Sequence, residues 1–130
     1  AFGNYSAYCL SKIMLIKMCE LLADEVPDLK TFIIGPGYIK TKIHNETLKA
    51  GALAGKNLLK TEKFLTSAGT PLIDVFNCIQ WCNSQPSVIV SGRNVSVVHD
   101  PWKDGGEELK QQLKDDENMF KLRRSSNNLV

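Results

Sequence analysis

The sequence has no apolar run long enough to cross a membrane as a helix. Its longest apolar run, Ile13 to Ile16, ends at Lys17, whereas a membrane-spanning helix needs about 20 predominantly apolar residues. It also lacks a basic N-terminal segment followed by an apolar one, so no secretory signal is visible. We therefore expect no membrane partner and a cytoplasmic location.

The chain has little excess charge and little material for a metal site. Its 16 basic and 14 acidic residues leave a net charge of +2, which is too small to indicate nucleic acid as the main partner. The four cysteines form no C-x-x-C pair, and no cluster of cysteine and histidine completes a metal site around Cys78 and Cys82. We expect buried thiols, no metal and no nucleic acid.

The overall composition is that of one globular domain or part of one. The 130 residues are 43% hydrophobic and 23% charged, close to the averages for globular chains. The chain begins with Ala1 rather than methionine, directly before a strong helical pattern, so we expect it to be cut from a longer polypeptide.

The apolar pattern predicts a mostly alternating order of helices and strands. A helix is expected over 5–25, with apolar residues on more than one face, and a buried strand over 31–34, ended by the Gly-Pro-Gly of 35–37. The mixed segment 38–70 has the length of a substrate loop or lid. A second helix over 71–83 and a strand region over 88–98 follow. We expect 101–130 to be a charged tail, solvated and helical over 107–116.

The main catalytic candidates are Tyr8 and Lys12, near the start of the first predicted helix. Residues four apart lie on one helix face, so the Lys12 ammonium can approach the Tyr8 phenol. A phenol is ordinarily protonated at neutral pH, and a nearby cation and a helix N-terminus both favour its ionised form. The pair is therefore a candidate general acid and base.

Two further patterns are weaker. Tyr38 and Lys42 repeat the Tyr-x-x-x-Lys spacing, but in a predicted loop, where no helix fixes it, and we interpret this repeat as coincidence. The Gly35-Pro36-Gly37 turn begins like a dinucleotide fingerprint, but Lys40 stands where the third glycine is required. The glycine-rich phosphate cradle is therefore not in this chain.

The Tyr-x-x-Ser-Lys block at 8–12 and the Pro-Gly-x-Ile-x-Thr block at 36–41, in this order and about thirty residues apart, resemble the short-chain dehydrogenase/reductase family. The resemblance implies an α/β fold over 1–100, the C-terminal half of a Rossmann-like doubly wound parallel sheet with flanking helices. It also implies an NAD or NADP cofactor, a small carbonyl or alcohol substrate, and a homo-oligomer paired through the first helix.

The resemblance also assigns roles to residues. Tyr8 would donate a proton to the substrate carbonyl oxygen, and Lys12 would favour the phenolate and bind the nicotinamide ribose. The implied cofactor-binding residues are Tyr8, Lys12, Pro36, Gly37, Ile39 and Thr41.

The sequence departs from the family in what it does not contain. The family's catalytic serine, its proton-relay asparagine and its glycine-rich loop would all precede Ala1. We therefore expect an NAD(P)-dependent oxidoreductase whose isolated C-terminal half, as given, is inactive. The alternative is a non-catalytic Rossmann-like assembly module in which the Tyr8/Lys12 pair is a relic.

Overall fold

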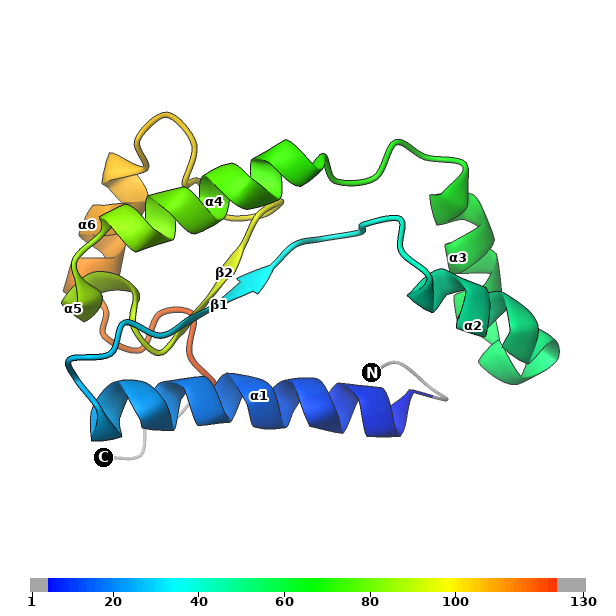
Figure 1. Cartoon of the computed structure of the whole chain (residues 1–130), viewed down its shortest axis with the longest axis horizontal. Coiled ribbons are helices and arrows are strands. Elements are labelled where there is room, and N and C mark those ends of the chain that lie inside the picture. Colours follow the sequence, from blue (N-terminus) through cyan, green and yellow to red (C-terminus); the bar gives the residue numbers. More distant parts are fainter. Residues whose placement is uncertain (1–4, 124–130) are drawn as a thin grey trace.

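The computed structural model describes residues 5–123, and helices account for 57% of it. Figure 1 shows two strands between helix α4 above and helix α1 below, with α2 and α3 at the far end of the molecule. In chain order the elements are α1 (Ser6–Glu25), β1 (Phe32–Gly35), α2 (Ile43–Ala50), the 3-10 helix η1 (Gly51–Ala54), α3 (Lys56–Leu65), α4 (Leu72–Ser84), α5 (Ser87–Val90), β2 (Arg93–Ser96) and α6 (Glu107–Asp115).

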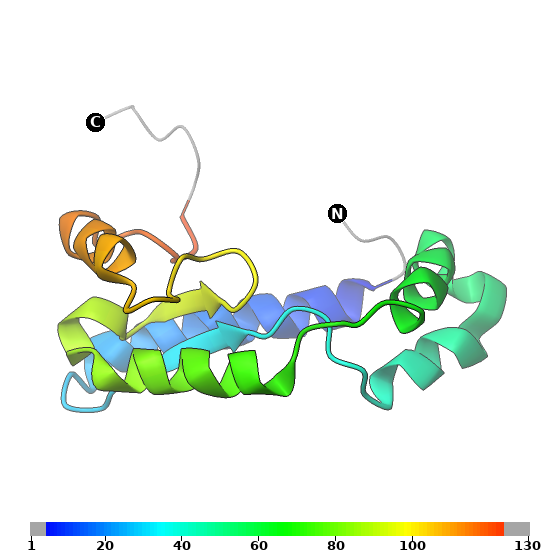
Figure 2. The ribbon, with the colours of Figure 1, turned by 90° about the horizontal axis from the view of Figure 1, so that it is seen from above.

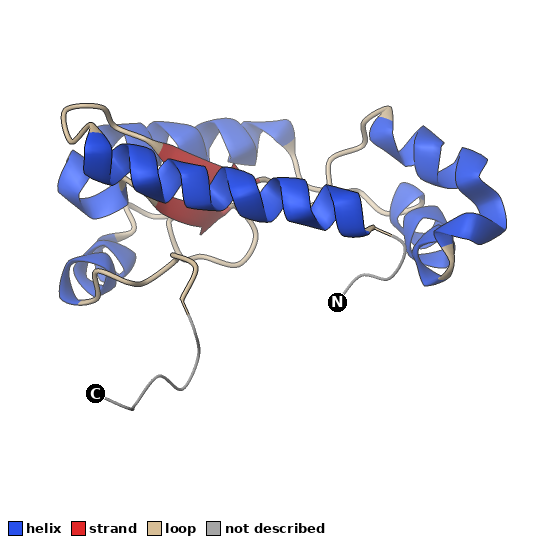
Figure 3. Ribbon diagram, turned by 90° about the horizontal axis from the view of Figure 1, so that it is seen from below, coloured by secondary structure: helices blue, strands red, loops and turns tan. Residues whose placement is uncertain are grey.

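The predicted doubly wound parallel sheet is wrong for the part of the chain that the structure describes. The sheet there has two strands, β1 and β2, paired in parallel with Phe32 opposite Arg93 and Gly35 opposite Ser96. Each strand is four residues long. Figure 3, seen from below, shows how small this strand pair is beside the helices. The described fold is therefore α-rich around a two-stranded parallel ribbon.

The last predicted strand region is shorter than expected because its first part is a helix. Ser87–Val90 forms the single turn α5, which follows Pro86, and the strand begins only at Arg93. Between them Gly92 has φ +74°, a conformation that glycine adopts without steric cost. A β-branched run of three residues is too short for periodicity to separate a strand from a buried helical turn.

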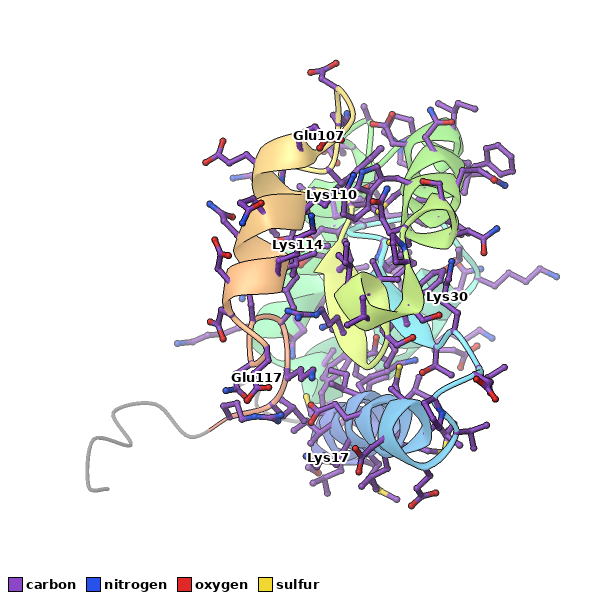
Figure 4. All side chains as sticks on the ribbon, turned by 90° about the vertical axis from the view of Figure 1, so that its left-hand side faces the viewer. Lys17, Lys30, Glu107, Lys110, Lys114 and Glu117 are labelled. Carbon is purple, nitrogen blue, oxygen red and sulfur yellow. The ribbon has the colours of Figure 1, made fainter. Side chains whose placement is uncertain are left out.

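The core lies between α4, α5, β2 and α6. Its buried members are Cys78, Trp81, Cys82, Ile89, Val90, Val95, Val97, Trp102, Leu109 and Leu113. The charge of this segment predicted a solvated helix over 107–116. Helix α6 is only partly solvated, because Leu109 and Leu113 are almost completely buried. Figure 4 shows that Glu107, Lys110 and Lys114 follow one another along this helix. The rest of the predicted charged tail, from residue 124 on, lies outside the described residues.

A buried carboxylate ties the end of the described chain to α1. Glu20, 8% exposed, accepts hydrogen bonds from Lys17 Nζ at 2.8 Å, from Arg123 Nη1 at 2.7 Å and from the Leu122 backbone N–H at 2.7 Å. Burial alone would raise the pKa of Glu20, but these hydrogen bonds outweigh it and lower the pKa from 4.5 to about 2. Residues about a hundred positions apart are thereby held together.

We expect this carboxylate to make folding stability depend on acid pH. Its pKa is depressed in the folded state, so its contribution is present above about pH 4.5 and is lost as the pH falls towards about 2. The partners Lys17 and Arg123 are about half exposed, so solvent screening reduces the contribution to about 1–2 kcal/mol. Urea unfolding of wild type and Glu20→Gln should differ by this amount at pH 7 and converge near pH 2. A difference that stays constant with pH would contradict the prediction.

None of the helices within residues 5–123 has both the length and the apolar composition of a membrane span. Figures 1 and 2 both show the N-terminal end of α1 beside α2 and α3, away from the core. This junction is where the candidate site lies.

Candidate functional site

A pocket of about 270 Å³ lies where the start of α1 meets the loop after β1 and helices α2 and α3. Three separate segments therefore build it, and helix α1 supplies the predicted catalytic tyrosine. The residues that line it are Tyr5, Tyr8, Cys9, Tyr38, His44, Thr47, Asn57, Lys60 and Thr61.

Tyr8 and Lys12 are brought together on the surface of α1 as the helical spacing predicts. The Lys12 ammonium lies over the face of the Tyr8 ring, 5.4 Å from the ring centroid. Tyr8 is 47% exposed, and its ring forms part of the pocket wall. The Ser11 hydroxyl donates a hydrogen bond to the backbone carbonyl of Tyr8 at 2.7 Å, within the first turns of the helix. The pair thus places a cation over the face of a ring that lines the pocket.

The loop that follows β1 is fixed to the segment before α4. The Thr70 backbone N–H donates a hydrogen bond to the Tyr38 carbonyl at 2.8 Å. Gly37 has φ +72°, and a Cβ atom there would lie 2.5 Å from both Thr70 Oγ1 and Val98 Cγ2. A larger residue at this position would therefore displace the loop, which explains the glycine in local terms.

The other residues of the predicted cofactor set do not line this pocket. The backbone carbonyl of Ile39 lies 2.9 Å from His44 Nε2, at hydrogen-bond distance. The backbone carbonyl of Thr41 accepts a hydrogen bond from the His44 backbone N–H at 3.2 Å. Of the set, Tyr8 lines the pocket, while Gly37 lines a second one nearby. Within the turn at 36–41, Ile39 and Thr41 act through their backbone carbonyls, whereas Tyr38 lines the pocket.

Several pocket residues were not singled out by the sequence. The Tyr5 hydroxyl hydrogen-bonds the Thr47 hydroxyl at 2.7 Å, which joins α1 to α2, and the Tyr5 ring meets the Tyr8 ring edge to face at 6.2 Å. Tyr38, whose Tyr-x-x-x-Lys spacing was interpreted as coincidence, lies in the same pocket as Tyr8. The spacing between Tyr38 and Lys42 was the one sequence signal that drew attention to Tyr38. That spacing did not predict that Tyr38 and Tyr8 share a pocket.

Buried Phe64 supports the aromatic wall from behind. Its ring centroid lies 4.7 Å from that of Tyr38 and 4.9 Å from that of His44, in tilted stacks. Phe64 is 7% exposed and anchors α3 at this point. The rings of Tyr38 and His44 are thereby held against a fixed surface.

A second pocket of about 520 Å³ shares Tyr38 with the first. Its lining combines the end of β1, the end of α3 and the turn after β2, namely Gly37, Tyr38, Phe64, Ser67, Gly69, Thr70, Val98 and His99. Tyr38 therefore separates two hollows, of which only the first contains the Tyr8 ring.

Within residues 5–123, no group of histidine, cysteine and acidic side chains is arranged to hold a metal ion. Cys19, Cys78 and Cys82 are buried and free, as the sequence predicted, and Cys9 is half-buried at the pocket. The hydrogen bond with Cys78, together with burial, raises the pKa of the Cys82 thiol. This thiol is therefore inert in its buried position.

Comparison of the chain with protein-family models, with curated proteins and with solved structures gives no match. The functional argument therefore depends on the two sequence blocks and on the pocket geometry.

Proposed function

We propose that the protein is an NAD(P)-dependent oxidoreductase that interconverts a carbonyl and a secondary alcohol, with Tyr8 as general acid and base. The observation that carries the proposal is the position of the Tyr8 ring. It stands in the wall of a ligand-sized pocket, and the Lys12 ammonium lies 5.4 Å from the ring centroid. The resemblance to short-chain dehydrogenases/reductases assigns the roles of proton donor and cation to these two residues.

The residues present fit one end of a nicotinamide dinucleotide. Tyr8 and Lys12 are exposed donors next to a pocket, which suits a ribose with its two hydroxyls. The diphosphate needs a glycine-rich turn at a helix N-terminus, and the sequence of this chain lacks that fingerprint. We therefore assign only the nicotinamide-ribose end to these residues, and full-length protein is the material for every test of activity.

The chain's own residues have separable tasks in the proposed reaction. When bound, the nicotinamide supplies or accepts the hydride. Tyr8 donates its phenolic proton to the carbonyl oxygen during reduction and recovers it during oxidation. Lys12 stabilises the phenolate that remains, because a cation beside an anion lowers its energy. Helices α2 and α3, which occupy the predicted lid segment 38–70, form the opposite wall of the pocket.

Isotope transfer tests the proposal directly. Full-length protein is incubated with NADH or NADPH carrying deuterium at both C4 positions and with a panel of aldehydes and ketones, and the products are examined by mass spectrometry. We expect deuterium on the former carbonyl carbon of at least one product. Folded protein that transfers no deuterium to any member from either reduced cofactor would contradict the proposal.

The exposed surface of α1 is what supports the alternative, a non-catalytic assembly module. An enzyme can also assemble through such a surface. Apolar side chains are exposed along this helix, among them Met14 at 70% and Met18 at 51%. A contiguous apolar helix face of this kind is typical of an interface with another protein surface. Self-association through α1 is therefore part of the proposal.

Met14→Lys or Met18→Lys should raise the dissociation constant of self-association at least tenfold, which is about 1.4 kcal/mol, because the new charge would be buried between the two α1 helices. Sedimentation equilibrium of full-length protein measures this dissociation constant. Val88→Lys, at an 86% exposed apolar residue of α5, is the matched control and should leave the mass unchanged. A loss of stability without a change of mass would mean that another part of the same subunit covers this face. An unchanged mass with unchanged stability would mean that the face is solvated.

A further inference from the structure

Helices α2 and α3 and the 3-10 helix η1, together called the lid, are joined to the rest of the molecule by two stems of chain (Figure 1). One stem leaves β1 through Gly37, and the other enters α4 after Gly69. The stems touch, because the Thr70 backbone N–H donates a hydrogen bond to the Tyr38 carbonyl at 2.8 Å. Gly37 has φ +72° and Gly69 has φ +69°, a region that glycine adopts without steric cost. Two such residues at the base of one segment can absorb the backbone rotation of a hinge.

The lid packs on itself rather than into the core. Among the described residues its buried side chains are Ala54 and Phe64. The Phe64 ring stacks on Tyr38 and His44, which belong to the same segment 38–70. The core between α4, α5, β2 and α6 is built from residues outside this segment. A unit with its own small cluster and with glycines in both stems can move as one body.

Tyr5 links the lid to the helix that carries Tyr8. It is the N-cap residue of α1, and its hydroxyl hydrogen-bonds the Thr47 hydroxyl of α2 at 2.7 Å. Its ring also meets the Tyr8 ring edge to face, with 6.2 Å between the centroids. Tyr5 and Thr47 are half-buried, and both line the pocket. The hydrogen bond therefore spans the boundary between the two parts that a hinge motion would separate.

We propose that Tyr5 is a positioning residue, whose hydrogen bond to Thr47 holds the lid closed over the pocket that contains Tyr8. The lid opens by rotation about Gly37 and Gly69, and the bond between the two hydroxyls breaks as it does. Closing returns α2 to Tyr5, whose ring contacts the Tyr8 ring in the pocket wall. This inference rests on the proposed function and adds the regulation of access to that same site.

Cys9 reports on the lid, because it lines the pocket and is half-buried, whereas Cys19, Cys78 and Cys82 are buried. Full-length protein is treated with methyl methanethiosulfonate or with a biotin-linked methanethiosulfonate, and modification of Cys9 is followed by mass spectrometry of its peptide. Both reagents perform the same reaction, so the ratio of their rates reports access and cancels changes in thiol reactivity. We expect the bulky reagent to be slowed in wild type, relative to the ratio measured for an unfolded peptide.

Removing either hydroxyl should favour the open lid. Tyr5→Phe keeps the ring, and Thr47→Val keeps the shape of the side chain, so each variant loses the hydrogen bond. Each should raise the relative rate of the bulky reagent about two- to tenfold, the range for one hydrogen bond. The double variant should show no more than the larger single effect, because both changes remove the same bond. Thr61→Val, at another threonine of the pocket lining on α3, is the matched control and should leave the ratio unchanged.

Kinetics supply a readout that a purely structural role would not give. Opening lowers the population of the closed form, so Tyr5→Phe should raise KM for any carbonyl that full-length protein reduces. The value of kcat should not fall, because the substitution leaves the proton donor Tyr8 in place. A general loss of structure would instead expose Cys78 to both reagents and lower kcat. Where Tyr5→Phe exposes Cys78, Thr47→Val carries the test.

The outcomes distinguish this inference from the proposed function. A bulky reagent that is not slowed in wild type, unchanged ratios in both single variants, or a double variant whose effect is the product of the single effects would overturn this role of Tyr5. Deuterium transfer by wild type together with any of these results would leave the oxidoreductase standing. Ratios that depend on Tyr5 and Thr47, without deuterium transfer to any carbonyl, would support the lid and contradict the reaction.

Discussion

Replacing Tyr8 with phenylalanine should lower kcat/KM for carbonyl reduction by about 10²–10⁴-fold, the usual contribution of a general acid. The substitution removes only the hydroxyl and keeps the ring in the pocket wall, so the lost rate reports the missing proton donor. Tyr8 is 47% exposed, so unfolding free energy should change by no more than about 0.5 kcal/mol. Nicotinamide absorbance with full-length protein measures the rate, and thermal unfolding measures stability.

Tyr38→Phe is the matched control, since it removes a hydroxyl from another tyrosine of the same pocket. Its rate should stay within about threefold of wild type, because phenylalanine retains the ring that packs against Phe64 and the lost hydroxyl is not the proposed proton donor. If Tyr8→Phe retained the wild-type rate, or if both variants lost activity equally, Tyr8 would not be the proton donor.

Features set by local sequence were predicted well. Helix α1 begins at Ser6 and ends at Glu25, close to the expected 5–25, and Pro71 directly precedes α4 as its N-cap residue. Tyr8 and Lys12 meet because helical geometry fixes residues four apart, whatever the rest of the fold does. Such contacts need no knowledge of tertiary structure.

Features set by distant contacts were not predicted. The pocket joins Tyr8 to Tyr38 and Thr47, which come from segments that no local pattern connects. The doubly wound sheet was implied by the resemblance to short-chain dehydrogenases/reductases, but the described chain supplies only two four-residue strands. The buried role of Glu20 was also missed, because its partners Leu122 and Arg123 lie more than a hundred residues away.

Arg93 is the clearest case of a charged residue whose role only the fold reveals. It lies on β2, is 3% exposed, and donates hydrogen bonds to the carbonyls of Leu113 at 2.7 Å, Asp116 at 3.0 Å and Met119 at 2.9 Å. The Leu113 carbonyl belongs to the last turn of α6, where carbonyls have no intrahelical donor. Burial lowers the pKa of Arg93, and the nearby charges of Asp116 and Glu117 oppose that shift. The guanidinium therefore caps the helix from inside the core.

We expect Arg93→Met to destabilise the protein by about 2–4 kcal/mol, because the carbonyls of Leu113, Asp116 and Met119 each lose a hydrogen bond from the buried guanidinium while the apolar stem is kept. The exposed Lys114 of α6 is the control, and Lys114→Met should change the unfolding free energy by less than about 0.5 kcal/mol. Chemical denaturation measures both variants. Hydrogen exchange adds a local readout, since the amides of α6 should lose protection before those of α4 do.

The loss of the buried Arg93 charge acts in the opposite direction to the loss of its hydrogen bonds. Removing Arg93 also removes a buried charge, and relief of its desolvation cost can offset the lost hydrogen bonds. The atom Nε of Arg93 is buried without a hydrogen-bond partner among the described residues, so part of that cost remains in the folded protein. Arg93→Met as stable as wild type would show that desolvation balances the cap. Because the three carbonyls are fixed by the end of α6 and the turn after it, we expect the lost donors to dominate, with Arg93→Lys falling between wild type and Arg93→Met.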